Sequence, residues 1–268
     1  MTDDDLARAL AQLTVEAGAV VMEVYATDFE VRTKDDASPV SEADEQAEVL
    51  ILTGLARLLP GVTVVAEEAV AAAGLPDVPD EFLLVDPLDG TREFVHRRGD
   101  FTVNIALVRS GLPVLGAVYA PVREKVYVGG PTAGIADVRP GGTVPDLQPL
   151  RTRAYPAEGL TAVASASHLD AETETFLSGL PLADRRSAGS SLKLCMLAAG
   201  EADVYPRFGP TMEWDIAAGH AVLAAAGGQV LNPDGSAFTY AKPGMRNGPF
   251  VAWGRERLTP IGSDHETA

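Results

Sequence analysis

The sequence of 268 residues contains a single cysteine, Cys195, so it cannot form an intramolecular disulfide framework. A chain with so little cysteine is typical of a reducing compartment, and we therefore predict a cytoplasmic protein. No apolar run is long enough to span a bilayer, and residues 1–5 lack the basic-then-apolar order of a signal peptide. The sequence leaves peripheral contact with a membrane open.

Basic residues are also scarce. The chain has 21 Lys and Arg against 38 Asp and Glu, which gives a formal net charge of −17. Because a nucleic-acid-binding protein needs a basic surface, this composition argues against a nucleic-acid partner. An anionic substrate would require a local reversal of the field by metal ions, a helix N-terminus or a few placed Lys and Arg.

Several catalytic motifs are missing. No G-x-x-x-x-G-K-[ST] phosphate loop occurs, and one Cys with four scattered His does not favour a zinc site. Residues 190–193 contain S-x-x-K, but the S-D-N and K-T-G partners of a serine acyl enzyme are absent. His96, His168 and His220 have no neighbouring nucleophile, so structural or surface roles are favoured.

The most informative segment is residues 82–91, Phe-Leu-Leu-Val-Asp-Pro-Leu-Asp-Gly-Thr. Its four apolar residues predict a buried strand that ends at Asp86, because Pro87 cannot continue a hydrogen-bonded ladder. Asp89 then lies three positions on, in a turn. Two carboxylates this close repel unless a cation joins them, and a hard divalent metal suits them. The same residue types also suit an ordinary turn, so the segment alone allows both interpretations.

An aspartyl nucleophile of the haloacid-dehalogenase type is excluded by spacing. That chemistry uses D-x-D-G-T, whereas residues 86–91 are D-P-L-D-G-T, one residue longer and far from the N-terminus.

Hydrophobic periodicity and turn residues predict alternating helices and strands. Residues 3–5 are expected to cap the first helix, and Ser41 with Asp44 matches a helix-starting capping box. Residues 71–79 are expected to form a loop, and the Gly- and Pro-rich residues 131–149 a lobe boundary. Helices are predicted at 6–24, from 41–44 to 58 or 59, at 171–177, at 191–199, and from 214–215 to 227–228. Strands are predicted at 62–66, 82–85, 101–108, 114–119, 125–128, 160–166 and 202–206, with 101–128 as an antiparallel meander.

Further carboxylates lie at the predicted strand and helix ends. The strand at 62–66 ends at Glu67, and it would bring Glu67 to the same sheet edge as Asp86. Asp215 is also a candidate N-cap for the following helix, and that role alone would explain why an aspartate occurs there. In the same way, the capping box alone would explain Asp44. Glu67, Asp86, Asp89 and Asp215 together carry four negative charges, which two Mg²⁺ ions would cancel with positions left for a phosphate and a water.

Three segments resemble the inositol monophosphatase superfamily of Mg²⁺-dependent, lithium-sensitive phosphatases. They are Glu67-Glu68, residues 86–91 (DPLDGT) and residues 214–219 (WDIAAG). Four further stretches resemble one branch, the CysQ-type 3'(2'),5'-bisphosphate nucleotidases of sulfur metabolism: DPLDGTREF from 86, FTVNIAL from 101, GSSLK from 189 and YPRFGPTMEWDIAAGHAV from 205. Inositol-specific members show I-D-G-T-T-N-F at the centre instead. The likeness runs from about residue 33 to residue 228.

The resemblance implies a two-lobed αβαβα layered sandwich of the α/β class, with most metal ligands in residues 1–140 and Asp215 and substrate contacts in residues 141–268. It implies two or three Mg²⁺ ions held by Glu67, Asp86, Asp89, Asp215 and the Leu88 carbonyl. Asp44, Glu67 and Thr91 are the implied catalytic residues, and the Gly90 and Thr91 amides the implied phosphate donors. Glu67, Leu88, Asp89 and Asp215 would also contact the substrate.

The expected function is therefore hydrolysis of adenosine 3',5'-bisphosphate to AMP and phosphate by an activated water. We expect Lys193 and Arg207 near the second phosphate, although each also suits an ordinary exposed charge. The alternatives are an inositol monophosphatase or related sugar-phosphate phosphatase, and a catalytically silent binding protein. The sequence does not distinguish a monomer from a homodimer, and it offers no account of Glu213.

Overall fold

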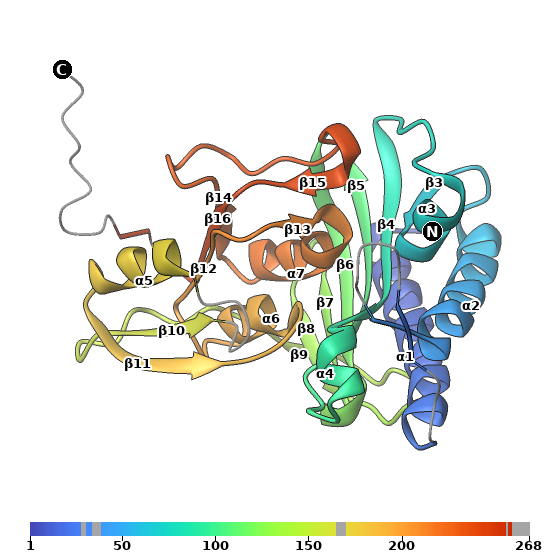
Figure 1. Cartoon of the computed structure of the whole chain (residues 1–268), viewed down its shortest axis with the longest axis horizontal. Helices are drawn as coiled ribbons and strands as arrows, with labels where there is room; N and C mark the ends of the chain where they lie inside the picture. Colours follow the sequence, from blue (N-terminus) through green and yellow to red (C-terminus); the bar gives the residue numbers. More distant parts are fainter. Residues whose placement is uncertain (28–30, 34–38, 165–169, 256, 259–268) are drawn as a thin grey trace.

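The computed structural model describes residues 1–27, 31–33, 39–164, 170–255 and 257–258. Helices and two large β-sheets alternate in five layers, in the order helix, sheet, helix, sheet, helix (Figure 1). This arrangement confirms the predicted α/β layered sandwich. Within the described residues, no helix has the length and apolar character needed to cross a membrane.

The first sheet has seven strands in the order β3-β4-β5-β6-β7-β8-β9. β3 runs parallel to β4, and every other neighbouring pair is antiparallel, so the meander predicted at 101–128 is confirmed. The strands are β3 (Thr63–Ala66), β4 (Glu81–Asp89), β5 (Thr102–Arg109), β6 (Leu112–Ala120), β7 (Lys125–Gly129), β8 (Gly134–Asp137) and β9 (Gln148–Pro149).

The central strands are apolar on both faces because the sheet is covered on both sides. In β4, Phe82 and Leu84 pack into the core between the two sheets, whereas Leu83 and Val85 pack into the core under the outer helices. Successive side chains of a strand point to opposite faces, so a continuous apolar run is what a doubly covered strand requires.

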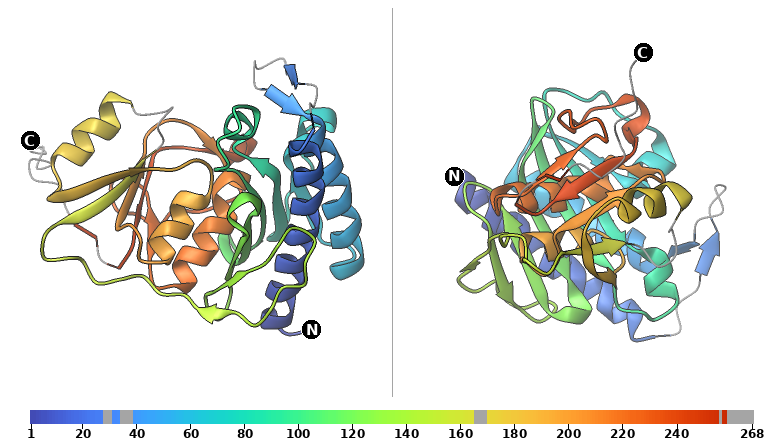
Figure 2. Two further views of the ribbon diagram at one scale, coloured as in Figure 1. Left: turned by 90° about the horizontal axis from the view of Figure 1, so that it is seen from below. Right: turned by 90° about the vertical axis from the view of Figure 1, so that its left-hand side faces the viewer.

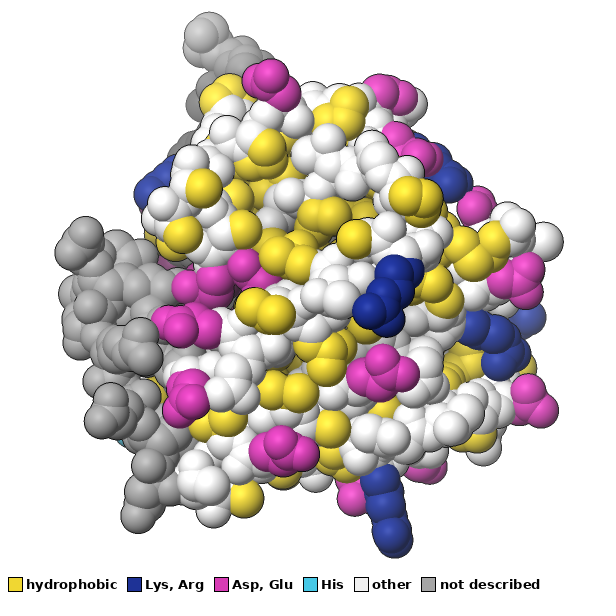
Figure 3. Space-filling model, turned by 90° about the vertical axis from the view of Figure 1, so that its right-hand side faces the viewer, with side chains coloured by type: hydrophobic (Ala, Val, Ile, Leu, Met, Phe, Trp, Pro, Cys, Tyr) yellow, Lys and Arg dark blue, Asp and Glu magenta, His cyan; other side chains and the backbone are white. Residues whose placement is uncertain are grey.

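Two long helices cover the outer face, α1 (Asp3–Tyr25) and α2 (Glu42–Leu58), which lie side by side (Figure 2). Both were predicted, but the α1 cap is Thr2, whose hydroxyl accepts from the amide of Asp5, rather than an aspartate. The side chain of Ser41, the other half of the predicted α2 capping box, lies outside the described residues. Figure 3 shows this side of the molecule, with acidic side chains spread among apolar and polar ones.

Two helices lie between the sheets, α6 (Leu192–Ala198) and α7 (Glu213–Ala225). α7 packs directly on β5, β6 and β7. Glycine permits this close approach, since a Cβ on Gly116 would stand 2.4 Å from the backbone oxygen of Ala218. A Cβ on Gly129 would stand 2.5 Å from the backbone oxygen of Ala221.

The second sheet has five strands in the order β11-β10-β12-β16-β14, and α5 (Ala171–Ser178) packs against it. Its strands are β10 (Leu160–Ala164), β11 (Leu182–Ser187), β12 (Val204–Arg207), β14 (Gln229–Leu231) and β16 (Phe250–Trp253). The smaller elements are β1 (Val31–Thr33), β2 (Pro39–Ser41), α3 (Glu67–Ala73), α4 (Thr91–Val95), η1 (Pro121–Arg123), β13 (Thr211–Met212), η2 (Pro243–Met245) and β15 (Arg246–Asn247).

Several boundaries differ from the sequence predictions. β4 does not end at Asp86 but continues to Asp89, and the predicted loop at 71–79 is helical as far as Ala73. The Gly- and Pro-rich residues 131–149 add β8 and β9 to the first sheet, so the chain passes to the second sheet only between Pro149 and Leu160. The division at residues 140 and 141 stays a prediction. Residues 165–166 and His168 lie outside the described residues.

Candidate active site

A cleft of about 300 Å³ opens where the first sheet meets α6, α7 and β12. Nine of the ten residues predicted for the site line it; the tenth, Asp44, does not. The nine are Glu67, Asp86, Leu88, Asp89, Gly90, Thr91, Lys193, Arg207 and Asp215. The fold therefore brings together residues from five separate parts of the chain.

Glu67 and Asp86 are neighbours because β3 and β4 are parallel and in register. Ala66 lies opposite Val85, and the residue that follows each of them in the chain is one of the two acids. Asp86 is almost completely buried, with 1% of its surface exposed. The predicted meeting of these two carboxylates at one sheet edge agrees with this register.

A bulge in β4 separates Asp86 from Asp89. Asp86 pairs with Asn104 and Asp89 with Thr102, so three steps along β4 match two along β5. Pro87 lies in this bulge, one of the few places where a sheet accepts a residue without an amide proton. This explains why the strand continues through Pro87, against the prediction that it ends there.

The segment then turns sharply into α4 at Gly90. Its φ is +94°, a left-handed conformation that favours glycine, and a Cβ there would stand 3.1 Å from the backbone oxygen of Asp100. The following residue, Thr91, starts α4, and its hydroxyl donates to the Leu88 carbonyl at 3.2 Å.

Asp215 comes from the first turn of α7. Its carboxylate accepts from the amide of Met212 at 2.8 Å, so it closes back on the residue before the helix. The alternative interpretation of Asp215 as the N-cap does not hold, because the helix already begins at Glu213 and Met212 occupies the cap position.

The three aspartates share one hydrogen-bonding pattern. One oxygen of each accepts from a main-chain amide: Asp86 from Leu88 at 3.1 Å, Asp89 from Ser191 at 2.5 Å and Asp215 from Met212. Among the described residues, the second oxygen of each has no hydrogen bond. Each carboxylate is thus held in place while one oxygen stays available to a ligand.

An oxygen-only donor set of this kind suits a hard divalent cation such as Mg²⁺. No three Asp, Glu, His or Cys side chains of the described part of the chain already surround one point closely enough to hold an ion. Carboxylates without a cation repel one another, and bringing the free oxygens together requires the positive charge itself. By their charge and their oxygen donors, the residues present therefore fit a divalent ion.

Burial and mutual repulsion change the pKa values of the three aspartates. Burial, followed by the charges of Glu67, Asp89, Asp215 and Asp44, raises the pKa of Asp86 well above its usual range. Burial and the charge of Asp89 likewise raise the pKa of Asp215. Burial raises the pKa of Asp89 to about 6, although nearby Lys193 and the Ser191 amide act in the opposite direction. A bound cation would stabilise the charged form of all three carboxylates and so lower their pKa values.

Asp44 is buried in the first turn of α2, with 2% of its surface exposed. Its charge contributes to the raised pKa of Asp86, although Asp44 itself does not line the cleft. Its predicted action on Thr91 stays a prediction.

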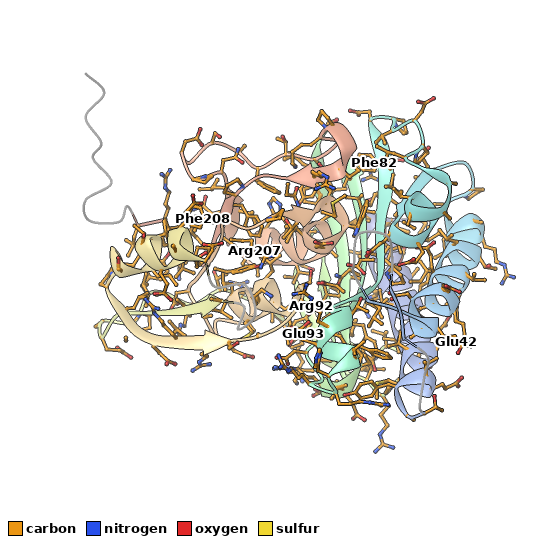
Figure 4. The ribbon with its side chains drawn as sticks, viewed as in Figure 1. Glu42, Phe82, Arg92, Glu93, Arg207 and Phe208 are labelled. Atoms are coloured by element: carbon orange, nitrogen blue, oxygen red, sulfur yellow. The ribbon has the colours of Figure 1, made fainter. Side chains whose placement is uncertain are left out.

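Three cations line the cleft beside the acids: Arg92, Lys193 and Arg207. Figure 4 shows Arg92 and Glu93 on α4 and Arg207 on β12 near the centre of the molecule. The Arg207 guanidinium donates to the carbonyls of Gly209 and Pro210, both at 3.2 Å. These side chains supply the local positive charge that an anionic substrate requires of so acidic a protein.

Sequence reasoning missed two residues that hold Asp89. They are Ser191, whose amide donates to it, and Asn104, whose side-chain nitrogen donates to the same oxygen at 3.3 Å. The Asn104 side-chain oxygen and the hydroxyl of Thr102, two residues earlier on the same strand, have no partner among the described residues. A polar residue at 104 in an otherwise apolar strand was the available signal for Asn104.

Glu213 faces away from the cleft. Its carboxylate accepts from the amides of Ala241 and Lys242, each at 2.9 Å, and pairs with the Lys242 ammonium at 3.0 Å. This acid therefore anchors the segment before β15 to the start of α7.

Comparison with known proteins gives consistent matches. A model described as the inositol monophosphatase family matches residues 3–259. The proteins named 3'(2'),5'-bisphosphate nucleotidase CysQ from Salmonella typhimurium and Escherichia coli K12 are each 42% identical over 245 residues, 88% of this chain and 97% of theirs. The CysQ structure from Bacteroides thetaiotaomicron is 34% identical, with a TM-score of 0.79 over 94% of this chain and 98% of that one. An inositol monophosphatase structure from Anabaena, 24% identical with a TM-score of 0.72 over 94% and 91%, shares the fold.

Proposed function

Because the chain belongs to the inositol monophosphatase family, we propose that it is a 3'(2'),5'-bisphosphate nucleotidase that hydrolyses adenosine 3',5'-bisphosphate to AMP and phosphate. The names of the relatives matched over nearly their whole length support this substrate class. The observation that carries the proposal is the cleft in which three amide-anchored aspartates lie beside three cations.

We assign two or three Mg²⁺ ions to Glu67, Asp86, Asp89, Asp215 and the Leu88 carbonyl. Bound Mg²⁺ supplies an acidified water and offsets charge on the phosphate. The anchored oxygens keep each aspartate in place, and the free oxygens supply the charge that selects a dication.

The remaining residues handle the phosphate and the proton. The Gly90 and Thr91 amides bind the phosphate that is cleaved. The Thr91 hydroxyl, with Asp44 and Glu67, takes the proton of the attacking water. Water attacks phosphorus in line, the bond from phosphorus to the ribose oxygen breaks, that oxygen takes up a proton to become the 3'-hydroxyl of AMP, and no phosphoenzyme forms.

We assign the second phosphate to the wall that carries Arg207. The guanidinium is held by two carbonyls of its own loop and is partly exposed to the cleft. Lys193 adds positive charge to the same wall, but its ammonium already faces two carbonyls. Lithium inhibition belongs to the same proposal, whereas oligomeric state and cytoplasmic location stay predictions.

Phosphate release from a substrate panel tests the proposal. With Mg²⁺, kcat/KM is expected to be higher for adenosine 3',5'-bisphosphate than for inositol 1-phosphate or fructose 1,6-bisphosphate, and EDTA should abolish release. Higher kcat/KM on inositol 1-phosphate would favour the inositol monophosphatase alternative. No release from any member would favour a silent binding protein.

A further inference from the structure

The short turn at residues 188–191, between β11 and α6, contacts both sides of the candidate site. The Ser191 amide donates to the Asp89 carboxylate on the first sheet, at 2.5 Å. The Ser191 hydroxyl donates to the main-chain carbonyl of Asp215 at the start of α7, also at 2.5 Å. One residue of this turn therefore sets where two of the aspartates stand relative to each other.

The turn is strained and tightly packed. Ser190 has a φ of +49°, a conformation that residues with a side chain seldom adopt. A Cβ on Gly189 would stand 2.4 Å from the main-chain oxygen of Asp100. Such a backbone persists only where its surroundings hold it.

The Lys193 ammonium supplies that restraint. It donates to the carbonyl of Ser190 at 2.7 Å and to that of Ala188 at 3.4 Å, and it lies 5.2 Å from the centre of the Tyr205 ring. Only 4% of the residue is exposed. A buried cation must be well compensated, and here carbonyls, an aromatic face and the nearby Asp89 charge share that task.

We propose that Lys193 is a positioning residue, whose ammonium holds the 188–191 turn so that Ser191 fixes Asp89 and the start of α7 for Mg²⁺ binding. This inference rests on the proposed function, because it assumes that Asp89 and Asp215 hold the metal. In this role Lys193 affects Mg²⁺ binding through the turn. A Lys193 that contacted the phosphate directly would instead affect only substrate binding.

The Lys193→Met variant tests the assignment, since methionine keeps the length of the apolar stem and removes the ammonium. Titration calorimetry with Mg²⁺ and no nucleotide is expected to show an affinity about 10- to 100-fold weaker. kcat should fall by a similar factor for adenosine 3',5'-bisphosphate and for adenosine 3'-monophosphate. Amide hydrogen exchange at Ser191 should quicken in the metal-free protein.

A matched control is Lys125→Met, which removes the same charge from a partly exposed side chain paired with Asp137 on the first sheet. Its Mg²⁺ affinity should equal that of the wild type. If Lys193→Met does not fold, Lys193→Gln keeps amide donors for the two carbonyls without the charge, and it is measured in the same way.

Unchanged Mg²⁺ affinity and Ser191 exchange, with a raised KM for the bisphosphate only, would overturn the proposal and make Lys193 a phosphate contact. Unchanged values throughout would also overturn it. Since the calorimetry needs no substrate, a wild-type protein that binds Mg²⁺ but leaves the bisphosphate intact would refute the proposed function and still decide the role of Lys193.

Discussion

Within the site, the two oxygens of a single carboxylate have different uses. Asp86, Asp89 and Asp215 each give one oxygen to an amide and leave the other available. An amide donor orients the side chain before any ion binds, and the raised pKa of each group shows that its charge is poorly compensated without one. A site of this kind binds a cation with little reorganisation of the main chain.

Asp89→Asn is expected to reduce kcat by about a hundredfold or more, because it removes a ligand charge yet retains an oxygen for the Ser191 amide. The fold should persist, with a melting temperature close to that of the wild type in EDTA. Steady-state kinetics and thermal unfolding measure both quantities. Asp137→Asn, on an exposed pair with Lys125, is the matched control. Near-normal turnover by Asp89→Asn would remove Asp89 from the metal site.

Local sequence identifies the acids but not what holds them. The D-P-L-D-G-T segment and the pair Glu67-Glu68 mark strand ends and charge, which are properties of a few consecutive residues. Ser191 lies 102 positions from Asp89, so no local pattern reports their hydrogen bond. The same is true of Glu213, whose partners lie 28 and 29 positions further along the chain.

At the scale of single elements, α7 combines a functional end with a buried interior. Its first turn presents Asp215 to the cleft, while Glu213 and His220 face the segment that contains Phe238 and Tyr240. The His220 ring nitrogen Nδ1 lies 3.0 Å from the Tyr240 hydroxyl. Both polar side chains therefore tie α7 to the chain that follows it.

Glu213→Ala is expected to lower the free energy of unfolding by about 3 kcal/mol, because it deprives two amides and the Lys242 ammonium of their shared acceptor. Glu213→Gln, which keeps one acceptor oxygen, should lose less. Urea unfolding in EDTA measures the difference. Normal stability of Glu213→Ala combined with lost Mg²⁺ binding would instead make Glu213 a metal ligand.

His220 should make the protein acid-sensitive. Burial, and then the charge of Lys242, lowers the pKa of His220 to about 3, whereas an unfolded histidine has a pKa of about 6.5. Between these values the unfolded chain binds the extra proton, so this contribution to stability is complete above pH ~6.5 and is lost as the pH falls. From pH 7 to pH 5 the loss is about 2 kcal/mol.

Urea unfolding of wild type and His220→Gln at both pH values checks this contribution. The variant should show a pH dependence smaller by that amount. An identical pH dependence in the two proteins would contradict the buried neutral state of His220.

Helices and strands were predicted correctly where the hydrophobic periodicity is strong. The prediction failed for strands whose existence or length depends on pairing with residues far away in the sequence. The apolar stripe of α1 and the apolar runs of β5 and β6 are visible in short windows. β11 has mostly exposed polar residues, and β14 is only three residues long. β4 was cut short at Pro87 because the bulge depends on its pairing with β5.

At the scale of the whole molecule, the site exists because α7 lies flat against the first sheet. Gly116 allows the helix backbone to contact β6, and this contact sets the distance from Asp215 to Asp86 and Asp89. The two sheets and the helices between them therefore act as one unit, although the proposed ligands lie at residues 67–89 and at residue 215.

Gly116→Ala should push α7 away from the sheet, since the added Cβ would meet the Ala218 oxygen at 2.4 Å. The expected cost is about 1–3 kcal/mol of unfolding free energy. Mg²⁺ affinity should weaken as well, because Asp215 moves with the helix. Gly248→Ala, where a Cβ would meet nothing within 4 Å, is the control. Unchanged stability and affinity in Gly116→Ala would refute this packing role.

The central claim is that Glu67, Asp86, Asp89 and Asp215 form one metal site across the layers. Anomalous scattering from crystals soaked in Mn²⁺, which takes the same oxygen ligands as Mg²⁺, tests it most directly. Two or three peaks are expected within bonding distance of these carboxylates. Peaks bound elsewhere, or no peak beside Asp86 and Asp89, would contradict the account.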